Sequence, residues 1–524
     1  MAELLRTRRN TQRAPGASEY PPPRARGAPP AAQAAAPAAE TAPASTPEAA
    51  SSATAGPEPE AARDGGWLAV ALDAVRGRGG DPTHGPVGRA IVSLAVPMIL
   101  EMAMESVFAV VDIFFVSRLG AAAVATVGLT ESLLTVVYIV AAGLSIGATA
   151  LVARRTGAGE AERAAEAAGQ AIALGAGLSA ALGAAGVAFA PALLRAMGAD
   201  ADVLRLGTGY ATVMLGGSGT VVLLFLINAA FRGAGDAAIA MRILWIANGL
   251  NIVLDPLLIF GIGPFPELGV TGAAVATTAS RGLGVALQLA TLLRANGRLR
   301  LAVRHIRIRP TAVGRLLRLS AAGTLQAFIG GASWIFLIRI VSGFGSEAVA
   351  GYTVAIRVTL FALQPAWGLA NAAATMVGQG LGAGDPARAE RSVWIASGMN
   401  LAFLGAISVL FLLAAPTIVD LFGADPTTAG HAVRGLRILS PSLVFYAVGM
   451  VVAQSFNGAG APWTPTTLSL VCFWLWEIPL AWTLSHTAGL GPDGVFSAIA
   501  VAFSTLSIAA TLLFRRGRWK SAVV

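Results

Sequence analysis

From about residue 87 the chain alternates long apolar stretches with short polar ones. Six stretches contain no Asp, Glu, Lys or Arg, and they run over 132–153, 167–194, 206–231, 319–338, 358–384 and 438–476. The first five each match one membrane-spanning helix of ~20 residues, and the last is long enough for most of two. Five further apolar spans carry one to three charges, near 90–117, 239–261, 269–293, 392–415 and 493–514. Since lipid forces the backbone to bond internally, the pattern predicts an all-α polytopic membrane protein with about twelve transmembrane helices.

The composition excludes an ordinary soluble enzyme. Of the 524 residues, 55% are hydrophobic and 12% are charged, and the mean hydropathy is +0.68. Soluble domains carry about 25% charged residues, and one soluble core could not cover so much apolar surface. Lys520 is the only lysine and Cys472 the only cysteine, so a P-loop lysine, a Schiff base and thiolate metal clusters are excluded. We expect no catalytic residues, no metal and no organic cofactor.

The first 86 residues differ from the rest of the chain. They are rich in Ala, Pro, Ser, Thr and Arg, with runs of three prolines at 21–23 and three alanines at 34–36. Such a composition buries too little apolar surface to offset chain entropy, so it predicts a disordered cytoplasmic tail over 1–86, of which residues 1–65 can be deleted without loss of transport. Within it, residues 67–75 are predicted to form a short helix at the membrane interface. No apolar signal-peptide segment follows the basic start.

Positive charges gather on alternate loops. With the N-terminus inside, the inner loops and the C-terminus hold most of the arginines after residue 87, including eight between 294 and 318. The outer loops hold only Arg118, Arg195, Arg205, Arg434 and Arg437. This distribution predicts a multi-pass protein of a bacterial or archaeal inner membrane with both termini cytoplasmic. The net charge of +9 and the pI of about 10.8 then reflect membrane topology, and lipids rather than nucleic acid are the expected partners.

The chain contains an internal repeat with a shift of 225 positions. The Gly-Ala-Gly motif at 157–159 recurs at 382–384, and Gly-Ala-Gly at 233–235 recurs at 458–460. Each copy holds about six helices, an even number, so both copies have the same orientation in the membrane. The repeat predicts two parallel six-helix lobes around a central cavity, which is a transporter architecture. The expected N-lobe is 87–293 and the C-lobe 319–516, with a basic inter-lobe loop at 294–318 and a cytoplasmic C-terminus at 517–524.

Acidic side chains gather in the first lobe. Glu101, Glu105 and Asp112 fall within a ~40° arc of one helix, whereas their counterparts in the second copy are Gln326, Gly330 and Leu337. Asn251 and Asp255 share a face of a later helix. An ionised carboxylate near the membrane midplane costs at least ~2.5 kcal/mol, so these acids are expected to be protonated or to bind a cation. We predict ion coupling at Asp112 and Asp255, with structural hydrogen bonding as the alternative.

Several other polar residues are candidates for the cavity wall, and Pro97 is a candidate hinge. Arg357, Gln364 and Asn371 recur at heptad spacing, and Arg281 is expected to pair with an acid of the first lobe. Glu131 near a helix end and Glu477 in the second lobe are further acids whose role is left open. Pro97 precedes Glu101 by one turn and cannot donate its backbone hydrogen bond, so a hinge is predicted there, with a static kink as the alternative.

Residues 87–516 resemble the multidrug and toxic compound extrusion (MATE) family. The resemblance is carried by Leu-Ala-Val-Pro at 94–97, Val-Asp-Ile-Phe-Phe-Val at 111–116, Phe-Arg-Gly-Ala-Gly-Asp at 231–236, Asn-Ile-Val-Leu-Asp-Pro at 251–256 and Gly-Ala-Ala-Val-Ala-Thr at 272–277. It is closest to the archaeal and DinF-type branch. The resemblance implies a cation site in the N-lobe, formed by Asp112, Tyr210, Asn228, Asn251, Asp255 and Thr277. The family's second cation site lacks its acids here.

The sequence thus predicts a secondary antiporter, monomeric, that exports organic, cationic or amphipathic compounds in exchange for H⁺ or Na⁺. Glu101, Glu105, Arg281, Arg357, Gln364 and Asn371 are the predicted substrate-cavity residues. One alternative is a flippase for lipid-linked saccharides of the same superfamily, which is expected to have a cationic cavity. Another is a membrane receptor or scaffold, which would not need Asp112 and Asp255.

Overall fold

The computed structural model describes residues 66–294, 297–423 and 425–522, and this part of the chain is helical without any β-strand. Ten of its helices are long and apolar enough to cross a membrane. Two more, α2 (Val87–Ser117) and α8 (Val270–Leu293), pack among them and complete twelve spans. The predicted all-α architecture with about twelve transmembrane helices is confirmed.

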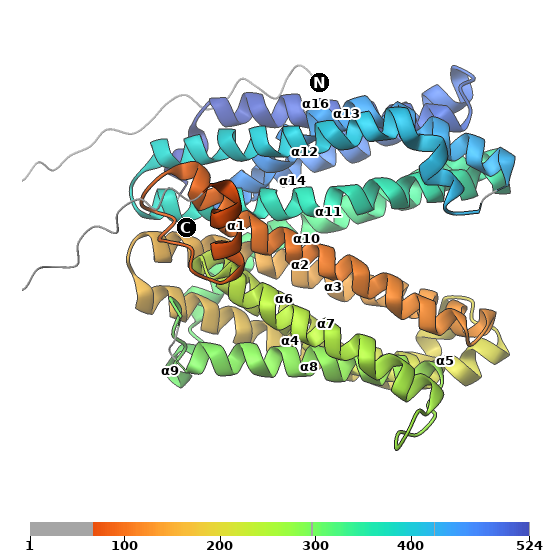
Figure 1. Ribbon diagram of the computed structural model, residues 1–524, viewed down its shortest axis with the longest axis horizontal. Coiled ribbons are helices and arrows are strands. Elements are labelled where there is room, and N and C mark those ends of the chain that lie inside the picture. The colour runs from red at the N-terminus through yellow and green to blue at the C-terminus, as the bar shows by residue number, and fades with distance from the viewer. Residues whose placement is uncertain (1–65, 295–296, 424, 523–524) are drawn as a thin grey trace, which may run out of the picture. The chain divides into compact units, whose positions relative to one another are not determined.

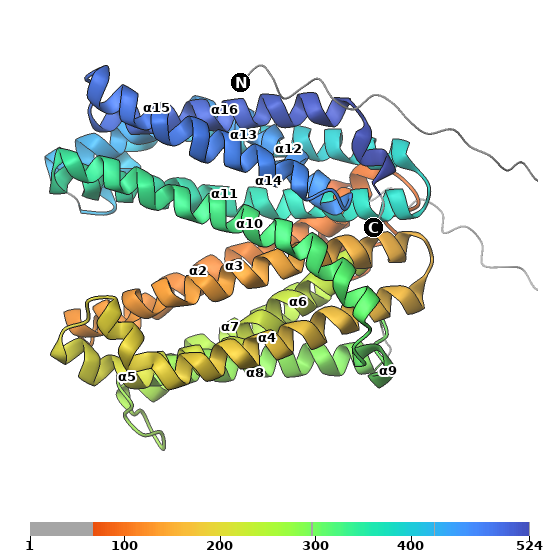
Figure 2. The same cartoon turned by 180° about the vertical axis from the view of Figure 1, so that it is seen from behind.

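The spans form two lobes, seen from opposite sides in Figures 1 and 2. Besides α2 and α8, the N-lobe contains α3 (Ala121–Gly157), α4 (Ala161–Ala196), α5 (Ala201–Gly216), α6 (Ser218–Ala234) and α7 (Ala237–Phe260). Helices α5 and α6 together make one span, Ala201–Ala234.

The C-lobe repeats this arrangement. It contains α10 (Pro310–Val341), α11 (Ser346–Gly382), α12 (Pro386–Asp420), α13 (Pro426–Gly458), α14 (Trp463–Ser469), α15 (Ile478–Trp482) and α16 (Pro492–Arg515). Helices α14 and α15 belong to one span, Trp463–Thr487, which includes π-helical turns at Leu470–Glu477 and Thr483–Thr487. Short 3₁₀ turns lie at Ser342–Phe344 and Arg518–Ser521.

Two boundaries differ from the expectation. Helix α10 begins at Pro310, so the last part of the expected loop 294–318 is helical, and α9 (Val303–Ile306) forms a turn before it. The arginines of this segment favoured a loop in the sequence prediction. A membrane-spanning helix can nevertheless extend beyond the apolar core into the polar interface, where arginines are tolerated. Helix α1 (Trp67–Val75) forms where a short helix was expected, and residues 76–86 are ordered against both lobes. The expected tail is therefore ordered from residue 66, and its disorder over 1–65 concerns residues outside those described.

The two lobes touch at one end of the bundle, where α2 begins and α16 ends (Figure 1). We call this the α1 end. A Cβ atom at Gly157 of α3 would collide with the carbonyl oxygen of Gln379 on α11. The repeat-related Gly382 of α11 stands in the same relation to the carbonyl oxygen of Arg154 on α3. Glycine is required at both positions because the helix backbones approach each other directly.

Helix α2 packs against both lobes. Its first turns, including Ile91, Leu94 and Met98, share a hydrophobic cluster with C-lobe residues such as Leu363 and Leu369. The helix also packs along α7 of the N-lobe. Met98 still packs with the C-lobe, and the acids from Glu101 onward bond to N-lobe side chains, so the partner of α2 changes within one turn after Pro97.

Candidate functional site

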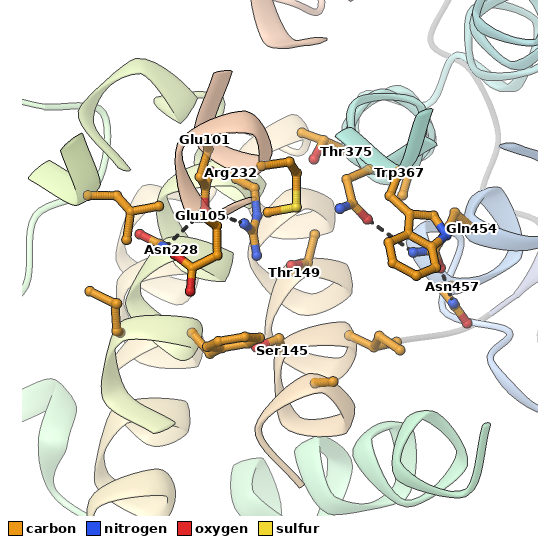
Figure 3. Close-up of a pocket in the computed structure, with 18 of the residues that line it drawn as sticks. Glu101, Glu105, Ser145, Thr149, Asn228, Arg232, Trp367, Thr375, Gln454 and Asn457 are labelled. Atoms are coloured by element: carbon orange, nitrogen blue, oxygen red, sulfur yellow. Dashed lines mark hydrogen bonds and ion pairs between the residues drawn. The ribbon is translucent and has the colours of Figure 1, made fainter. Parts of the chain in front are cut away.

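A cavity of ≈ 410 Å³ lies between the lobes. Its N-lobe wall comes mainly from α2, α3, α6 and α8, and its C-lobe wall from α11 and α13. Figure 3 shows the carboxylates of Glu101 and Glu105 with Arg232 on one side, and Trp367, Gln454 and Asn457 on the other. The cavity is thus bounded by ionic groups on the N-lobe side and by amides and an indole on the C-lobe side.

Glu101 is the most buried acid of the cavity wall, with 2% of its surface exposed. Arg232 donates to its Oε1 at 2.9 Å, and the Asn228 amide donates to the same atom at 3.0 Å. Gln288 in turn donates to Asn228 Oδ1 at 2.5 Å. Because Asn228 and Arg232 are four residues apart on α6, they share a face and reach Glu101 together. The buried charge of Glu101 is therefore compensated within the lobe.

The C-lobe contains the same contact without its charges. Shifting Glu101 and Arg232 by the repeat gives Gln326 and Asn457, and the Asn457 amide donates to Gln326 Oε1 at 3.3 Å. Asn457 also donates to Gln454 Oε1 at 2.5 Å, and Gln454 donates to Asn371 Oδ1 at 3.0 Å. The two lobes therefore hold equivalent helix pairs together, with an ion pair in one and an amide pair in the other.

Glu105 also faces an arginine, as expected for Arg281. Arg281 Nη2 lies 3.4 Å from Glu105 Oε1, and its Nη1 donates to the Tyr138 hydroxyl at 3.1 Å. The Asn248 amide donates to Glu105 Oε2 at 3.3 Å. The two acids that line the cavity are thus balanced by two arginines, so the acidic cavity face expected from the sequence carries no net charge.

A second polar cluster lies between α7 and α8. The Asn251 amide nitrogen donates to the Asp255 carboxylate. When the amide group is turned so that both its nitrogen and its oxygen have partners, the oxygen accepts from the Thr277 backbone N–H at 3.1 Å. Asp255 has 0% of its surface exposed. Within the residues described, no Arg, Lys or His lies within ion-pair distance of Asp255. This buried acid is bonded to the amide of Asn251, and the Thr277 hydroxyl bonds to that amide rather than to the acid.

The structure groups the other residues of the predicted cation site differently. The Oδ1 of Asp112 is buried without a hydrogen-bond partner among the described atoms. Tyr210 is buried in the N-lobe core. Asn228, in contrast, bonds to Glu101 rather than to the Asp255 cluster. Of the predicted cation site, Asn251, Asp255 and Thr277 therefore form one hydrogen-bonded cluster, and ion binding there stays a prediction.

The predicted cavity residues of α11 are partly separated. Gln364 and Asn371 line the cavity, but Arg357 is exposed and does not. Fourteen residues of helix place Arg357 about 21 Å from Asn371 along the axis, and a heptad stripe also drifts by ~20° per repeat. Glu131 is exposed, and Glu477 is buried with its Oε2 unpartnered among the described atoms.

Sequence reasoning missed Arg232, Trp367, Gln454 and Asn457 as cavity residues. Arg232 directly follows an apolar stretch, so its position in the sequence assigns it to an inner loop rather than to the cavity wall. The repeat contained a usable signal, because Arg232 and Asn457 occupy equivalent positions before Gly233 and Gly458.

Comparison with known proteins identifies the family. The MatE family model matches residues 97–257 and 328–483, which is more than half of the chain. The chain belongs to the MATE family of transporters.

Two relatives and one structure are consistent with this assignment. The "Probable multidrug resistance protein NorM" of Thermotoga maritima is 26% identical over 84% of this chain and 94% of its own length. A protein of the same name from Caulobacter vibrioides is 31% identical over 63% of this chain and 70% of its own. The outward-facing conformation of a multidrug resistance MATE family transporter matches with a TM-score of 0.78 and 27% identity, covering 86% of this chain and 99% of that one. The predicted family resemblance is confirmed.

The paired polar contacts of this MATE protein generate a stability prediction. Arg232→Asn leaves the buried Glu101 carboxylate without its cation, and breaking such a pair costs about 3–5 kcal/mol. The double variant Glu101→Gln with Arg232→Asn recreates the amide pair of the C-lobe. We expect it to recover at least half of the lost stability, measured by thermal unfolding in detergent. Equal or greater loss in the double variant would contradict the equivalence of the two pairs.

Proposed function

We propose that this MATE protein is a secondary antiporter that exports organic amphipathic compounds in exchange for H⁺ or Na⁺. One observation carries the proposal: among the described residues, Asp255 and Asp112 form no ion pair, whereas Glu101 and Glu105 each form one with an arginine. A carboxylate in lipid without a compensating charge favours uptake of a proton or a metal cation. Asp112, Asn251, Asp255 and Thr277 are the groups proposed to exchange that ion.

The substrate is proposed to bind in the cavity between the lobes. Trp367 and the amides of Gln364, Asn371 and Gln454 offer an aromatic surface and hydrogen bonds without net charge. The expectation of a cationic substrate rested on unpaired acids, and Glu101 and Glu105 are paired. We therefore propose amphipathic compounds as the class, without a requirement for positive charge. The balanced cavity also disfavours the saccharide flippase, which is expected to have an excess of arginine.

The direction of export follows if the α1 end is cytoplasmic, as the arginine distribution predicts. The lobes touch at that end through Gly157 and Gly382, so the cavity is closed toward the cytoplasm. This is the state from which a substrate leaves to the outside. The return step requires the lobes to separate at the α1 end and the ion to be bound, since a ligand drives a change only through different affinities for the two states. We propose that a monomer in the inner membrane suffices, with no cofactor other than the ion.

The coupling residues can be tested directly. Asp112→Asn and Asp255→Asn retain the side-chain shape but can neither exchange a proton nor neutralise Na⁺, so we expect each to lose coupled export and to fold normally. Export by proteoliposomes under an imposed ΔpH or ΔNa⁺ measures this. Asp420→Asn, the same change at an exposed acid at the end of α12, is the matched control and should transport like the wild type. Wild-type rates in both aspartate variants would refute the proposed coupling site.

Pro97 is proposed as the hinge of α2. The turns before it pack with the C-lobe and the acids after it bond to the N-lobe, so movement between lobes must be absorbed near this residue. We expect spin-label distances between the outer part of α2 and α8 to change with pH or Na⁺, and to change less in Pro97→Ala. A wild type whose distances respond to neither ion would exclude the hinge, and an equal response in Pro97→Ala would place it elsewhere.

A further inference from the structure

A segment near the N-terminus crosses the line where the lobes meet. After α1, residues 76–86 run along the α1 end of the bundle to the start of α2 (Figure 1). Pro82 approaches the position that a Cβ atom at Gly235 would occupy, and Gln379 approaches the same position from the C-lobe. Gln379 also donates to the Gly233 carbonyl oxygen at 2.8 Å, which is a hydrogen bond between lobes. Residues 76–86 therefore lie over the junction itself.

On one side the segment is held by arginines of the N-lobe and the loop that follows it. Arg298 Nη2 donates to the carbonyl oxygens of Gly79 and Gly80 at 3.3 and 3.0 Å. The backbone N–H of Arg298 donates to Asp236 Oδ2 at 2.9 Å, which ties this contact to the α6–α7 turn. Arg242 of α7 donates to the Val75 carbonyl oxygen at 2.6 Å. The beginning of the segment is thus attached to the N-lobe.

On the other side the segment is held by one residue of the C-lobe. The guanidinium group of Arg388, in the first turn of α12, donates to three carbonyl oxygens. Nη2 reaches Pro82 at 2.7 Å and His84 at 2.9 Å, and Nη1 reaches Gly85 at 2.8 Å. A planar guanidinium presents several donors in a fixed arrangement, so it suits a curved run of carbonyls. Lysine could not satisfy these acceptors in the same way.

A local turn shapes that run of carbonyls. Asp81 Oδ1 accepts from the Thr83 backbone N–H at 2.9 Å and from its hydroxyl at 2.8 Å, and Asp81 Oδ2 lies 3.0 Å from His84 Nδ1. Partial burial acts to raise the pKa of Asp81, but the hydrogen bonds from Thr83 and His84 and the charge of Arg298 outweigh it and lower that pKa. The turn is therefore intact at physiological pH.

We propose that residues 76–86 form a strap that joins the two lobes at the α1 end and holds that end closed. The inference rests on the proposed function only in that the lobes of an alternating-access antiporter must separate at this end. Opening breaks the strap's contacts on one side, because the N-lobe contacts and the Arg388 contacts lie on opposite sides of the junction. The strap thus favours the closed state by the free energy of those bonds, and its release is required in every cycle.

The test measures opening at the α1 end by spin-label distances. The labels occupy Ala161→Cys, at the start of α4, and Arg516→Cys, beyond α16, in a Cys472→Ser background, since both sites are exposed and neither contacts the strap. Arg388→Gln removes the fork of donors, and we expect the open population to rise on the order of tenfold, as the loss of charged hydrogen bonds implies. The matched control is Arg391→Gln, an exposed arginine of the same helix, which should match the wild type.

Two further variants separate the strap from general destabilisation. Deleting residues 1–65 should leave the distances unchanged, whereas Asp81→Ala, which removes the turn, should raise the open population as Arg388→Gln does. Thermal unfolding in detergent identifies any variant that has lost its fold. Wild-type distances in folded Arg388→Gln and Asp81→Ala would overturn the strap, whether or not the protein transports. Opening in both variants supports the strap even if the wild type shows no ion-coupled export, an outcome that would refute only the proposed function.

Discussion

A carboxylate buried in membrane helices needs a compensating charge or a bound ion, and the organisation of the N-lobe follows from this requirement. Glu101 and Glu105 are compensated by Arg232 and Arg281, and these pairs fix α6 and α8 against α2. Asp255 bonds to Asn251, which in turn bonds to Thr277, and no ion pair to Asp255 forms among the residues that the structure describes. The same helices therefore carry acids with an internal counter-charge and acids that depend on an external one. The first kind shapes the cavity, and the second is suited to coupling.

The internal repeat shows that these charges are present in one of two equivalent lobes. The two lobes share the glycine contacts at Gly157 and Gly382 and the helix pairing at Glu101 and Gln326. Because the amide pair of the C-lobe keeps the geometry without the charge, the fold itself does not need the ion pair. The charges of the N-lobe are then an addition to a symmetric scaffold. They make the two walls of the cavity chemically different, with ionic groups facing amides and Trp367.

The sequence predicted the features that depend on local pattern. The helices followed from apolar stretches of membrane length, and the two lobes followed from one register of repetition. Asn251 and Asp255 were correctly placed together because residues four apart share a helix face. The partner of Asn228 and the cavity position of Arg232 depend on how α6 packs against α2, which no local pattern encodes. Helix α10 was predicted too short, because its arginine-rich first turns lie outside the apolar stretch.

Under the proposed function, an ion gradient drives export through this chain. The most direct measurement uses purified protein in vesicles, a fluorescent amphipathic compound such as ethidium, and an imposed ΔpH or ΔNa⁺ without any other energy source. We expect the compound to accumulate against its own gradient when one of the two ions flows the opposite way, and we expect reversal of the ion gradient to reverse the movement. Movement of the compound only down its own gradient, unaffected by either ion, would contradict the proposed function.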